Sequence, residues 1–311
     1  MRRPRLACAA VVSLVASLAA VALARARRRA ADVPLSPVTA GPHVGPDFPE
    51  RAGLTTGVEP DGEMDDMADY ARSDFDPERV HPEVRRFYEE TGDYRMTATV
   101  TWHRGFRLGA ALAARVTSAV EQLNLPGPYE DSTVALTSRF AEVRADVDPR
   151  DEVRAWVRTD RETGEAVFVA LYGSHERGGG RDGNAERYAN DSGPSGSAGS
   201  RPAARYVNIA VPLPWANLST VLHLDHTDES GRGGDEDGEG EPDGTGIALT
   251  TRAGAEPGLY LVTPLGTFEL PLEQRFTVRP DESGITATQT MWVCGVRFLT
   301  VEYDAVRESD E

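Results

Sequence analysis

The residues with the clearest capacity to bind a ligand lie where a predicted strand meets a predicted helix. Trp102 and His103 end a run of alternating apolar and polar residues, and Arg104 and Arg107 begin the helical pattern that follows. An indole, an imidazole and two guanidinium groups at this junction could line the mouth of a pocket and bind an anion. The alternative is ordinary packing at the start of a helix. These four residues are the ligand-binding site that the sequence predicts.

The densest set of metal-ligating side chains is formed by His223, Asp225 and His226. His223 and Asp225 would share one face of a strand, and His226 could fold back toward the acidic stretch that follows. A catalytic metal needs three convergent ligands and an open position, and no other histidine lies nearby in the sequence. The acidic run 235–243 lacks the regular Gly-x-Asp spacing of a calcium loop. We therefore expect a solvated strand end and no metal site.

Common catalytic signatures do not occur in the sequence. It contains no GxSxG elbow, no HExxH, no Walker loop and no GxGxxG after a strand. The serines cluster in a glycine-rich stretch, where nothing would hold a nucleophile in place. We therefore expect a protein with no catalytic residues and no cofactor. The alternative is an enzyme that combines distant strands, such as a hydrolase or isomerase using His103 and a nearby carboxylate.

Other reactive or charged groups are expected to have structural roles only. Cys294 lies in an apolar run, which predicts a small buried core residue rather than a reactive thiol. Four charged residues of one predicted strand are expected to be exposed: Asp151, Glu152, Arg154 and Arg158.

Composition and charge narrow the class of protein. The 311 residues carry 33 basic side chains, every one an arginine, against 50 acidic ones, which gives a net charge of -17. Such a chain is a poor partner for nucleic acid, because phosphate binding needs a basic surface. An acidic surface without lysine resembles proteins of salt-loving archaea, whose carboxylates keep the chain hydrated where charges are strongly screened. Codon bias in a GC-rich genome is the alternative explanation for the arginines.

The first 29 residues predict a membrane or export segment. No charge occurs from residue 6 to residue 24, and a helix of that length comes close to the ~30 Å hydrocarbon thickness of a bilayer. We expect a single transmembrane anchor in the cell membrane, with an orientation left open by the arginines on both sides. Cleavage after Ala24 would instead yield a secreted protein. Translation from Met64 or Met67 would yield a cytoplasmic one.

The rest of the chain divides into a linker and one domain. Residues 30–79 are rich in proline, glycine and acidic residues without a sustained period, which predicts a disordered acidic linker. A single β-rich domain is expected over residues 80–306. It would begin with a short helix over 82–92 and a strand over 94–103. A longer helix is expected over 106–123, where apolar residues recur at spacings of three and four.

After this helix the apolar residues alternate with a period of two, which predicts strands. The expected strands are 133–145, 153–159, 166–173, 205–212, 220–225, 246–251, 258–263, 267–271, 274–279 and 285–303. The last is too long for one straight strand, and Gly295 is expected to mark a bend or reversal. Disordered insertions are expected near 175–204 and 226–245. The pattern predicts a mostly β (α+β) fold, an antiparallel barrel or two-layer sheet with one main helix, preceded by the N-terminal transmembrane or signal helix.

Several segments together carry a family resemblance: HPEVRRFYEETGDYRMTATVTWHRGF, VRAWVRT, RYVNIAVPLP, GLYLVTPLGTFELPLEQRFTV and MWVCGVRFLTVEY. They resemble the soluble C-terminal portion of an uncharacterised family of bacterial and archaeal proteins, the YndJ-like group. The resemblance covers roughly residues 81–303 without the two insertions, which implies that this part is one domain. It implies no activity and no site residues.

The expected function is non-catalytic. A membrane-tethered β-rich module would bind an apolar small molecule, a lipid or a partner protein of the envelope, because small antiparallel barrels can hold one ligand inside. A structural or assembly protein of the cell envelope is an alternative, as is the enzyme described above.

Overall fold

The computed structural model describes residues 24–30, 32–130, 132–176, 204–227, 245–253 and 256–308. The strands in these residues are β1 (Tyr94–Trp102), β2 (Thr133–Glu142), β3 (Asp151–Asp160), β4 (Ala166–Glu176), β5 (Arg205–Leu213), β6 (Ala216–His226), β7 (Ile247–Thr250), β8 (Gly258–Thr263), β9 (Gly266–Glu269), β10 (Leu272–Asp281), β11 (Gly284–Val293) and β12 (Val296–Arg307). The helices are α2 (Phe48–Arg51), α3 (Pro82–Glu89) and α4 (Arg107–Val120), with short 3-10 helices η1 (Met67–Tyr70), η2 (Pro77–Arg79), η3 (Thr91–Asp93) and η4 (Arg104–Phe106).

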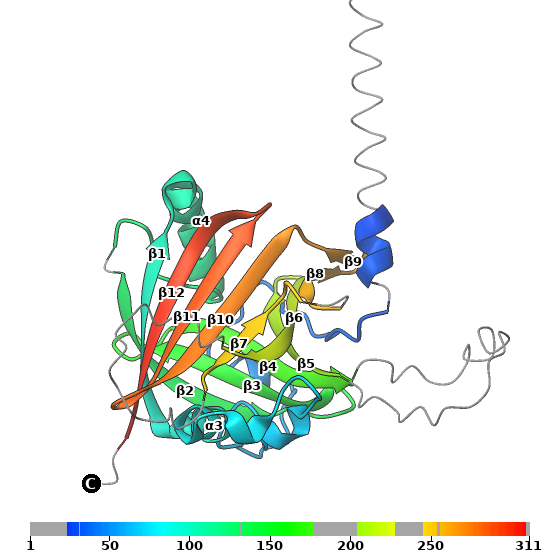
Figure 1. The fold of residues 1–311 in the computed structure, drawn as a ribbon. Coiled ribbons are helices and arrows are strands. Elements are labelled where there is room, and N and C mark those ends of the chain that lie inside the picture. The colour runs from blue at the N-terminus through cyan, green and yellow to red at the C-terminus, as the bar shows by residue number, and fades with distance from the viewer. Residues whose placement is uncertain are drawn as a thin grey trace, which may run out of the picture.

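The strands form one antiparallel sheet that closes on itself. Their order is β5-β4-β3-β2-β1-β12-β11-β10-β7-β6, and β6 also pairs with β5. This last pairing closes a ten-stranded barrel within the described residues (Figure 1). The β8–β9 hairpin extends the sheet outside the barrel along β6. The predicted mostly β fold with one main helix is therefore confirmed, in its barrel form.

Side-chain alternation explains how the barrel acquires an apolar interior. Along β1, Met96, Ala98 and Val100 are buried, while the intervening threonines are exposed or half-buried. Ala98 lies opposite Tyr303 on β12, and Val100 lies opposite Val301. Because successive side chains of a strand point to opposite faces, this register places one set of residues inside the barrel on every strand.

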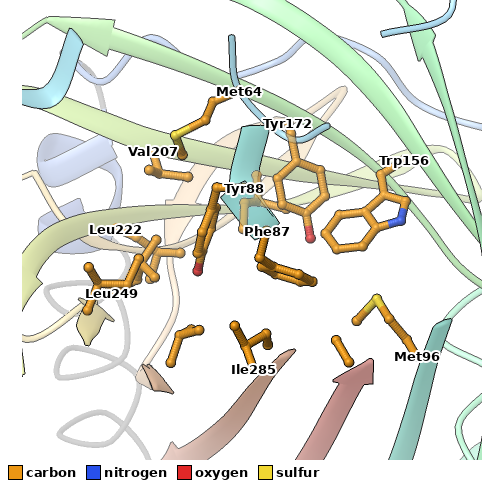
Figure 2. Close-up of a cluster of buried hydrophobic side chains, with 14 of the residues drawn as sticks. Met64, Phe87, Tyr88, Met96, Trp156, Tyr172, Val207, Leu222, Leu249 and Ile285 are labelled. Carbon is orange, nitrogen blue, oxygen red and sulfur yellow. The ribbon is translucent and has the colours of Figure 1, made fainter. Parts of the chain in front are cut away.

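One end of the barrel is closed by α3, which crosses the bottom of the view in Figure 1. Pro82 begins this helix, and the His81 ring accepts a hydrogen bond from the Glu83 backbone N–H, which caps its first turn. The helix buries Phe87 and Tyr88. Both rings point into the barrel between the side chains of opposite walls, as Figure 2 shows.

The expectation of a disordered linker over residues 30–79 is wrong. Val44 and Phe48 belong to a cluster of buried residues outside the barrel, together with Val157 and Leu171 of β3 and β4. Met67 and Phe75 join the main core. The few apolar residues of this segment are spaced widely, so they show no periodicity. They are nevertheless buried, because they pack against apolar residues of the barrel strands.

The main helix, α4, forms close to where the sequence predicts it, but its apolar face does not pack on the core. Leu108, Leu112 and Val116 are 71%, 60% and 63% exposed, and Ala110 is the buried residue of the helix. Apolar residues therefore recur along one side of α4 as predicted, but that side is exposed and does not pack against the described part of the chain. This exposed side is called the α4 apolar face below.

A tight hairpin joins β11 and β12 at the position where the sequence predicts a bend or reversal. Cys294 and Gly295 form its turn with φ angles of 49° and 77°, the left-handed conformation that two-residue hairpin turns require. Cys294 is exposed. The expectation that Cys294 is a buried core residue is wrong, because the turn places it beyond the end of the sheet.

Several sequence-based expectations lie outside the described residues. They concern the apolar segment up to residue 23 and most of the two insertions near 175–204 and 226–245. Residues 24–30 are helical. Among the residues that the structure describes, no helix has both the length and the apolar composition needed to cross a bilayer.

Candidate functional site: the interior of the barrel

The barrel interior contains a cavity of about 50 Å³, which is room for roughly four water molecules. Its walls come from strands on all sides and from α3. Most of the lining is apolar: Phe87, Met96, Trp156, Ile209, Leu222, Leu249, Phe276, Val278, Ile285 and Ala287. Figure 2 shows Met96, Trp156, Leu222, Leu249 and Ile285 of this lining converging from opposite walls. The polar members of the lining are Glu63, Tyr88, Arg158, Tyr172 and Tyr303.

Arg158 is the cation of this cavity. It lies on the inner face of β3, where it is 8% exposed. Its guanidinium carbon lies 4.3 Å from the ring centre of Trp156 and 4.4 Å from that of Phe168, so the group is held between two aromatic rings. Its Nη2 donates a hydrogen bond of 3.1 Å to the Tyr172 hydroxyl. Its buried Nε has no hydrogen-bond partner among the described residues.

The expectation that Arg154 and Arg158 are exposed is wrong, although Asp151 and Glu152 on the same strand are exposed as predicted. Arg154, Trp156 and Arg158 alternate along β3 and share its inner face, opposite Tyr172, Ala170 and Phe168 of β4. The tryptophan two residues from each arginine was the signal in the sequence: with a period of two, a buried Trp156 carries both arginines inward.

The two inward arginines differ in their partners. Arg154 lies near the α3 end, where its Nη1 donates to the Gly62 carbonyl at 2.9 Å and its Nη2 pairs with Asp65 at 2.8 Å. For Arg158, no carboxylate of the described residues lies within 4.0 Å. The segment before α3 therefore neutralises Arg154 and leaves Arg158 without a counter-ion.

Glu63 also lines this cavity, as well as a second one of about 10 Å³ next to it. Burial raises the pKa of Glu63 to about 8, against the opposing effect of the Arg158 and Arg154 charges. Glu63 is half-buried because it borders these two cavities, and protein surrounds the rest of the side chain. At neutral pH the group therefore holds its proton and does not cancel the charge of Arg158.

Two tyrosine side chains of the lining, Tyr172 and Tyr303, place their hydroxyl groups beside Arg158. The Tyr303 hydroxyl donates to the Gln289 side-chain oxygen at 3.1 Å. Burial raises the pKa of Tyr172 and Tyr303, so both remain protonated hydroxyls at neutral pH. The polar groups that line this cavity are thus one guanidinium, one neutral carboxyl and three phenol hydroxyls, within an otherwise apolar wall. This arrangement can bind a ligand, but the described residues of the lining include no activated nucleophile.

The predicted binding residues at the β1–α4 junction lie apart from this cavity. The Trp102 indole donates to the Pro126 carbonyl at 2.9 Å, and the Arg107 Nε donates to the Trp102 carbonyl at 3.2 Å. His103 shares a hydrogen bond of 3.0 Å with the Thr300 hydroxyl, and burial followed by the charges of Arg297 and Arg107 lowers its pKa. Arg104 and Arg107 are exposed. The structure brings these four residues together around the start of α4, and none of them lines the barrel cavity.

The histidine-rich end of β6 makes protein contacts. His223 lies 3.2 Å from the Arg72 Nη2 atom, and His226 stacks on Phe75 with ring centres 4.7 Å apart. Burial lowers the pKa of both histidines, with the nearby arginines adding to the effect. In the described part of the chain, no group of three histidine, cysteine or acidic side chains is arranged to hold a metal ion.

A larger cleft of about 360 Å³ lies outside the barrel, beside the β3–β4 hairpin. Two of its four carboxylates stabilise local turns: Glu130 accepts from the Gly127 N–H at 2.8 Å, and Asp160 accepts from the Glu162 N–H at 2.7 Å. Because these groups are satisfied by the backbone and open to solvent, the cleft does not rival the barrel interior as a site.

Comparison with known proteins supports the family resemblance. The chain is 30% identical over 269 residues to "Uncharacterized membrane protein YndJ" of Bacillus subtilis, an alignment that covers 84% of this chain and 41% of the relative. The chain thus spans about two-fifths of the length of that membrane protein. No protein-family model and no solved structure matches the chain. The similarity to the uncharacterised YndJ-like group, expected from the sequence, is confirmed over most of this chain.

Proposed function

We propose that this protein is a non-catalytic, membrane-tethered module whose barrel interior binds an apolar small molecule. The observation that carries the proposal is the cavity inside the barrel, with α3 across one end and mostly apolar side chains around an unfilled space. Side chains that face an unfilled space lack dispersion contacts on that side. An apolar ligand would supply these contacts, and it would be shielded from water by the barrel wall.

The ligand would have to be slender. The cavity of about 50 Å³ is small beside ligand pockets of ~300–1,000 Å³. The free space between the lining side chains, including the part open to solvent, is about 490 Å³. An alkyl chain is the class of ligand that fits such connected narrow gaps. Met96 supports this proposal, because an unbranched thioether side chain adapts its shape to what packs against it.

Tethering to a membrane is proposed from the sequence and from the contacts of residues 24–30. The apolar run over 6–24 directly precedes them, and the Bacillus relative is named a membrane protein. Arg27 donates to the Leu265 carbonyl at 3.0 Å, and Arg29 pairs with Glu269 at 3.1 Å. These contacts hold residues 24–30 on the β8–β9 hairpin. An anchor that ends at residue 24 would therefore hold this side of the barrel close to the bilayer.

The α4 apolar face (Leu108, Leu112 and Val116) supports the same orientation. Figure 1 places α4 and residues 24–30 on the side of the barrel away from α3. The stretch from Arg104 to Val120 contains three arginines and no acidic residue, although the whole chain has a net charge of -17. Exposed apolar residues combined with arginines are typical of helices that lie in the headgroup region of a membrane. We include this contact with the lipid surface in the proposed function.

The experiment that tests ligand binding fills the cavity from one strand. Ala287 lines the cavity on β11, and its neighbour Thr288 is exposed on the outer face of the same strand. Ala287→Phe should abolish the binding of 1-octanol to the full-length chain in calorimetry, whereas Thr288→Phe should leave it unchanged. If the unsubstituted protein binds no 1-octanol, or if both variants bind it equally well, the proposed function is wrong.

Tethering is tested separately by membrane fractionation combined with mass spectrometry of the mature N-terminus. Retention of residues 6–24 in the membrane fraction is expected. A soluble chain that begins after Ala24, or at Met64 or Met67, would contradict the tether without affecting the ligand-binding proposal.

A further inference from the structure

We propose that the ligand of the barrel interior is an alkyl chain that carries one anionic group, and that Arg158 binds that group. This inference rests on the proposed binding function and specifies the ligand class. It is carried by the position of Arg158, which lies 8% exposed on the cavity wall between two aromatic rings without a counter-ion among the described residues.

The first step in the argument is that the other buried arginines of the described chain have carboxylate partners. Besides Arg158 these are Arg150, which pairs with Asp148 at 2.8 Å, and Arg154, which pairs with Asp65 at 2.8 Å. A buried charge without a partner is costly, and proteins normally pair it. Arg158 differs from these arginines because no carboxylate of the described residues pairs with it. We therefore expect its anion to come from a ligand.

The second step concerns the free hydrogen-bonding capacity of Arg158. A guanidinium group has five N–H donors in a planar fork. The Tyr172 hydroxyl takes a hydrogen bond from Nη2, and the Tyr303 hydroxyl also interacts with the guanidinium group, while the buried Nε has no partner in the described residues. A carboxylate or phosphate monoester matches this fork better than any neutral polar group, because both oxygens can accept from it.

The third step concerns the protonation state of Glu63, the acidic side chain that lines the same cavity. Arg154, Arg158, Tyr70, Tyr88 and Tyr172 are the charged and titratable groups that face it across the two cavities. Its burial keeps it protonated at neutral pH. A neutral carboxyl can donate a hydrogen bond to a ligand anion, whereas an ionised one would compete with that anion for Arg158.

The fourth step is the rest of the chamber, which excludes a free inorganic anion as the best ligand. Leu222, Leu249 and Ile285 line the wall with hydrocarbon, which gains nothing from a small hydrated ion. An alkyl chain would contact them while its charged end reaches Arg158. Both halves of the lining are then used by one amphiphilic molecule.

The test is calorimetric titration of the full-length chain at pH 7 with octanoate, octyl phosphate, 1-octanol and octylammonium. We expect octanoate or octyl phosphate to bind at least tenfold more tightly than 1-octanol, and octylammonium to bind more weakly than 1-octanol. The preferred member of the two anions distinguishes a carboxylate ligand from a phosphate ligand. Acetate should bind at least a hundredfold more weakly than octanoate.

Substitution of the arginine assigns the effect to its charge. In Arg158→Met the affinity for the preferred anion should fall at least tenfold, to that for 1-octanol, while the affinity for 1-octanol stays unchanged. Arg275→Met is the matched control, since Arg275 is exposed on the outside of β10 and should not affect any of the ligands.

The outcomes separate this inference from the function on which it rests. Equal binding of octanoate, octyl phosphate and 1-octanol would overturn the inference and leave apolar ligand binding intact. Binding of none of them would overturn both. Acetate binding as tight as octanoate binding would also overturn the inference, because the site would then serve a small anion. The comparison of ligands on the unsubstituted protein decides the question even if Arg158→Met does not fold.

Discussion

Arg150 and Arg158 are both buried, but among the described residues a carboxylate neutralises the charge of Arg150 and none does so for Arg158. Arg150 lies outside the barrel wall, where it and Asp148 are 0% exposed and joined by two hydrogen bonds of 3.0 Å and 2.8 Å. Asn208 accepts two more hydrogen bonds from Arg150, and the Ser36 hydroxyl donates to Asp148 at 2.6 Å. Arg158 lies inside the barrel with two aromatic rings and the hydroxyls of Tyr172 and Tyr303.

The difference shows what each region is built to do. The Arg150 network has its charge cancelled and its donors satisfied, so it fixes Ser36 to the barrel and leaves no group free to bind a ligand. Burial would raise the pKa of Asp148, but its hydrogen bonds and the Arg150 charge outweigh burial and hold it below its usual value. The Arg158 region retains both a charge and a free donor. A buried arginine with this property is a candidate binding group rather than a structural one.

The largest expected effect comes from breaking the satisfied network. Arg150→Met leaves Asp148 buried without its cation, so the free energy of unfolding should fall by about 3–5 kcal/mol in urea denaturation. Arg95→Met, which removes an exposed pair with Glu308, is the control and should have a much smaller effect. A loss for Arg150→Met no larger than that of the control would contradict the structural role.

The next effect concerns Glu63 and the pH dependence of stability. The folded protein keeps the Glu63 proton up to about pH 8, whereas the unfolded chain loses it near pH 4.5. The contribution of this group to stability is therefore complete below pH 4.5 and is lost as the pH rises to about 8. Glu63→Gln should remove this decline and raise the free energy of unfolding at pH 8.5 by roughly 2–4 kcal/mol. Glu302→Gln, exposed on β12, is the control, and identical pH profiles for both variants would refute the buried, protonated state.

A smaller effect of the opposite sign to that of Arg150→Met is expected at Arg158. Replacing an unpaired buried charge with an apolar side chain of similar length should stabilise the protein by about 1–2 kcal/mol. Urea denaturation of Arg158→Met alongside Arg150→Met measures the contrast directly. If both variants lose stability to a similar extent, the two regions do not differ in the way described.

The smallest effect on stability is expected at the α4 apolar face. Leu112→Trp should change the free energy of unfolding by less than about 0.5 kcal/mol, because residue 112 is 60% exposed. In vesicles that contain brominated anionic lipid, the fluorescence of this variant should be quenched more than that of the unsubstituted protein. Val306→Trp is the control, since Val306 lies near the C-terminal end of β12 and is also exposed. Equal quenching in both variants would argue against contact between α4 and the lipid surface.

Much of the barrel follows from local patterns. The period of two in 94–103 and in the segments after residue 133 predicts β1 to β12 with end points within a few residues of those observed, apart from the start of β6 and the end of β12. Gly295 marks the β11–β12 hairpin because a two-residue turn needs positive φ angles. These features depend on neighbouring residues along the chain, so the sequence contains the information directly.

The binding region depends on contacts between distant residues. Glu63, Tyr88, Arg158 and Tyr303 come from four separate parts of the chain and meet only when the barrel closes. Nothing in the local sequence distinguishes Arg158 from an exposed arginine except its spacing from Trp156. For the same reason the packed residues 33–79 were expected to be disordered: their apolar residues have no period of their own and depend on the barrel surface for their sites.

The strand pattern, the main helix, the acidic charge balance and the resemblance to the YndJ-like group can all be read from residue types and their spacing. Three features become visible only in the folded chain: β5 pairs with β6 to close a barrel, the apolar face of α4 is exposed, and Arg158 faces inward without a counter-ion among the described residues. The physical reason is that burial and charge neutralisation depend on what surrounds a side chain in space, and closure of the sheet brings these surroundings together.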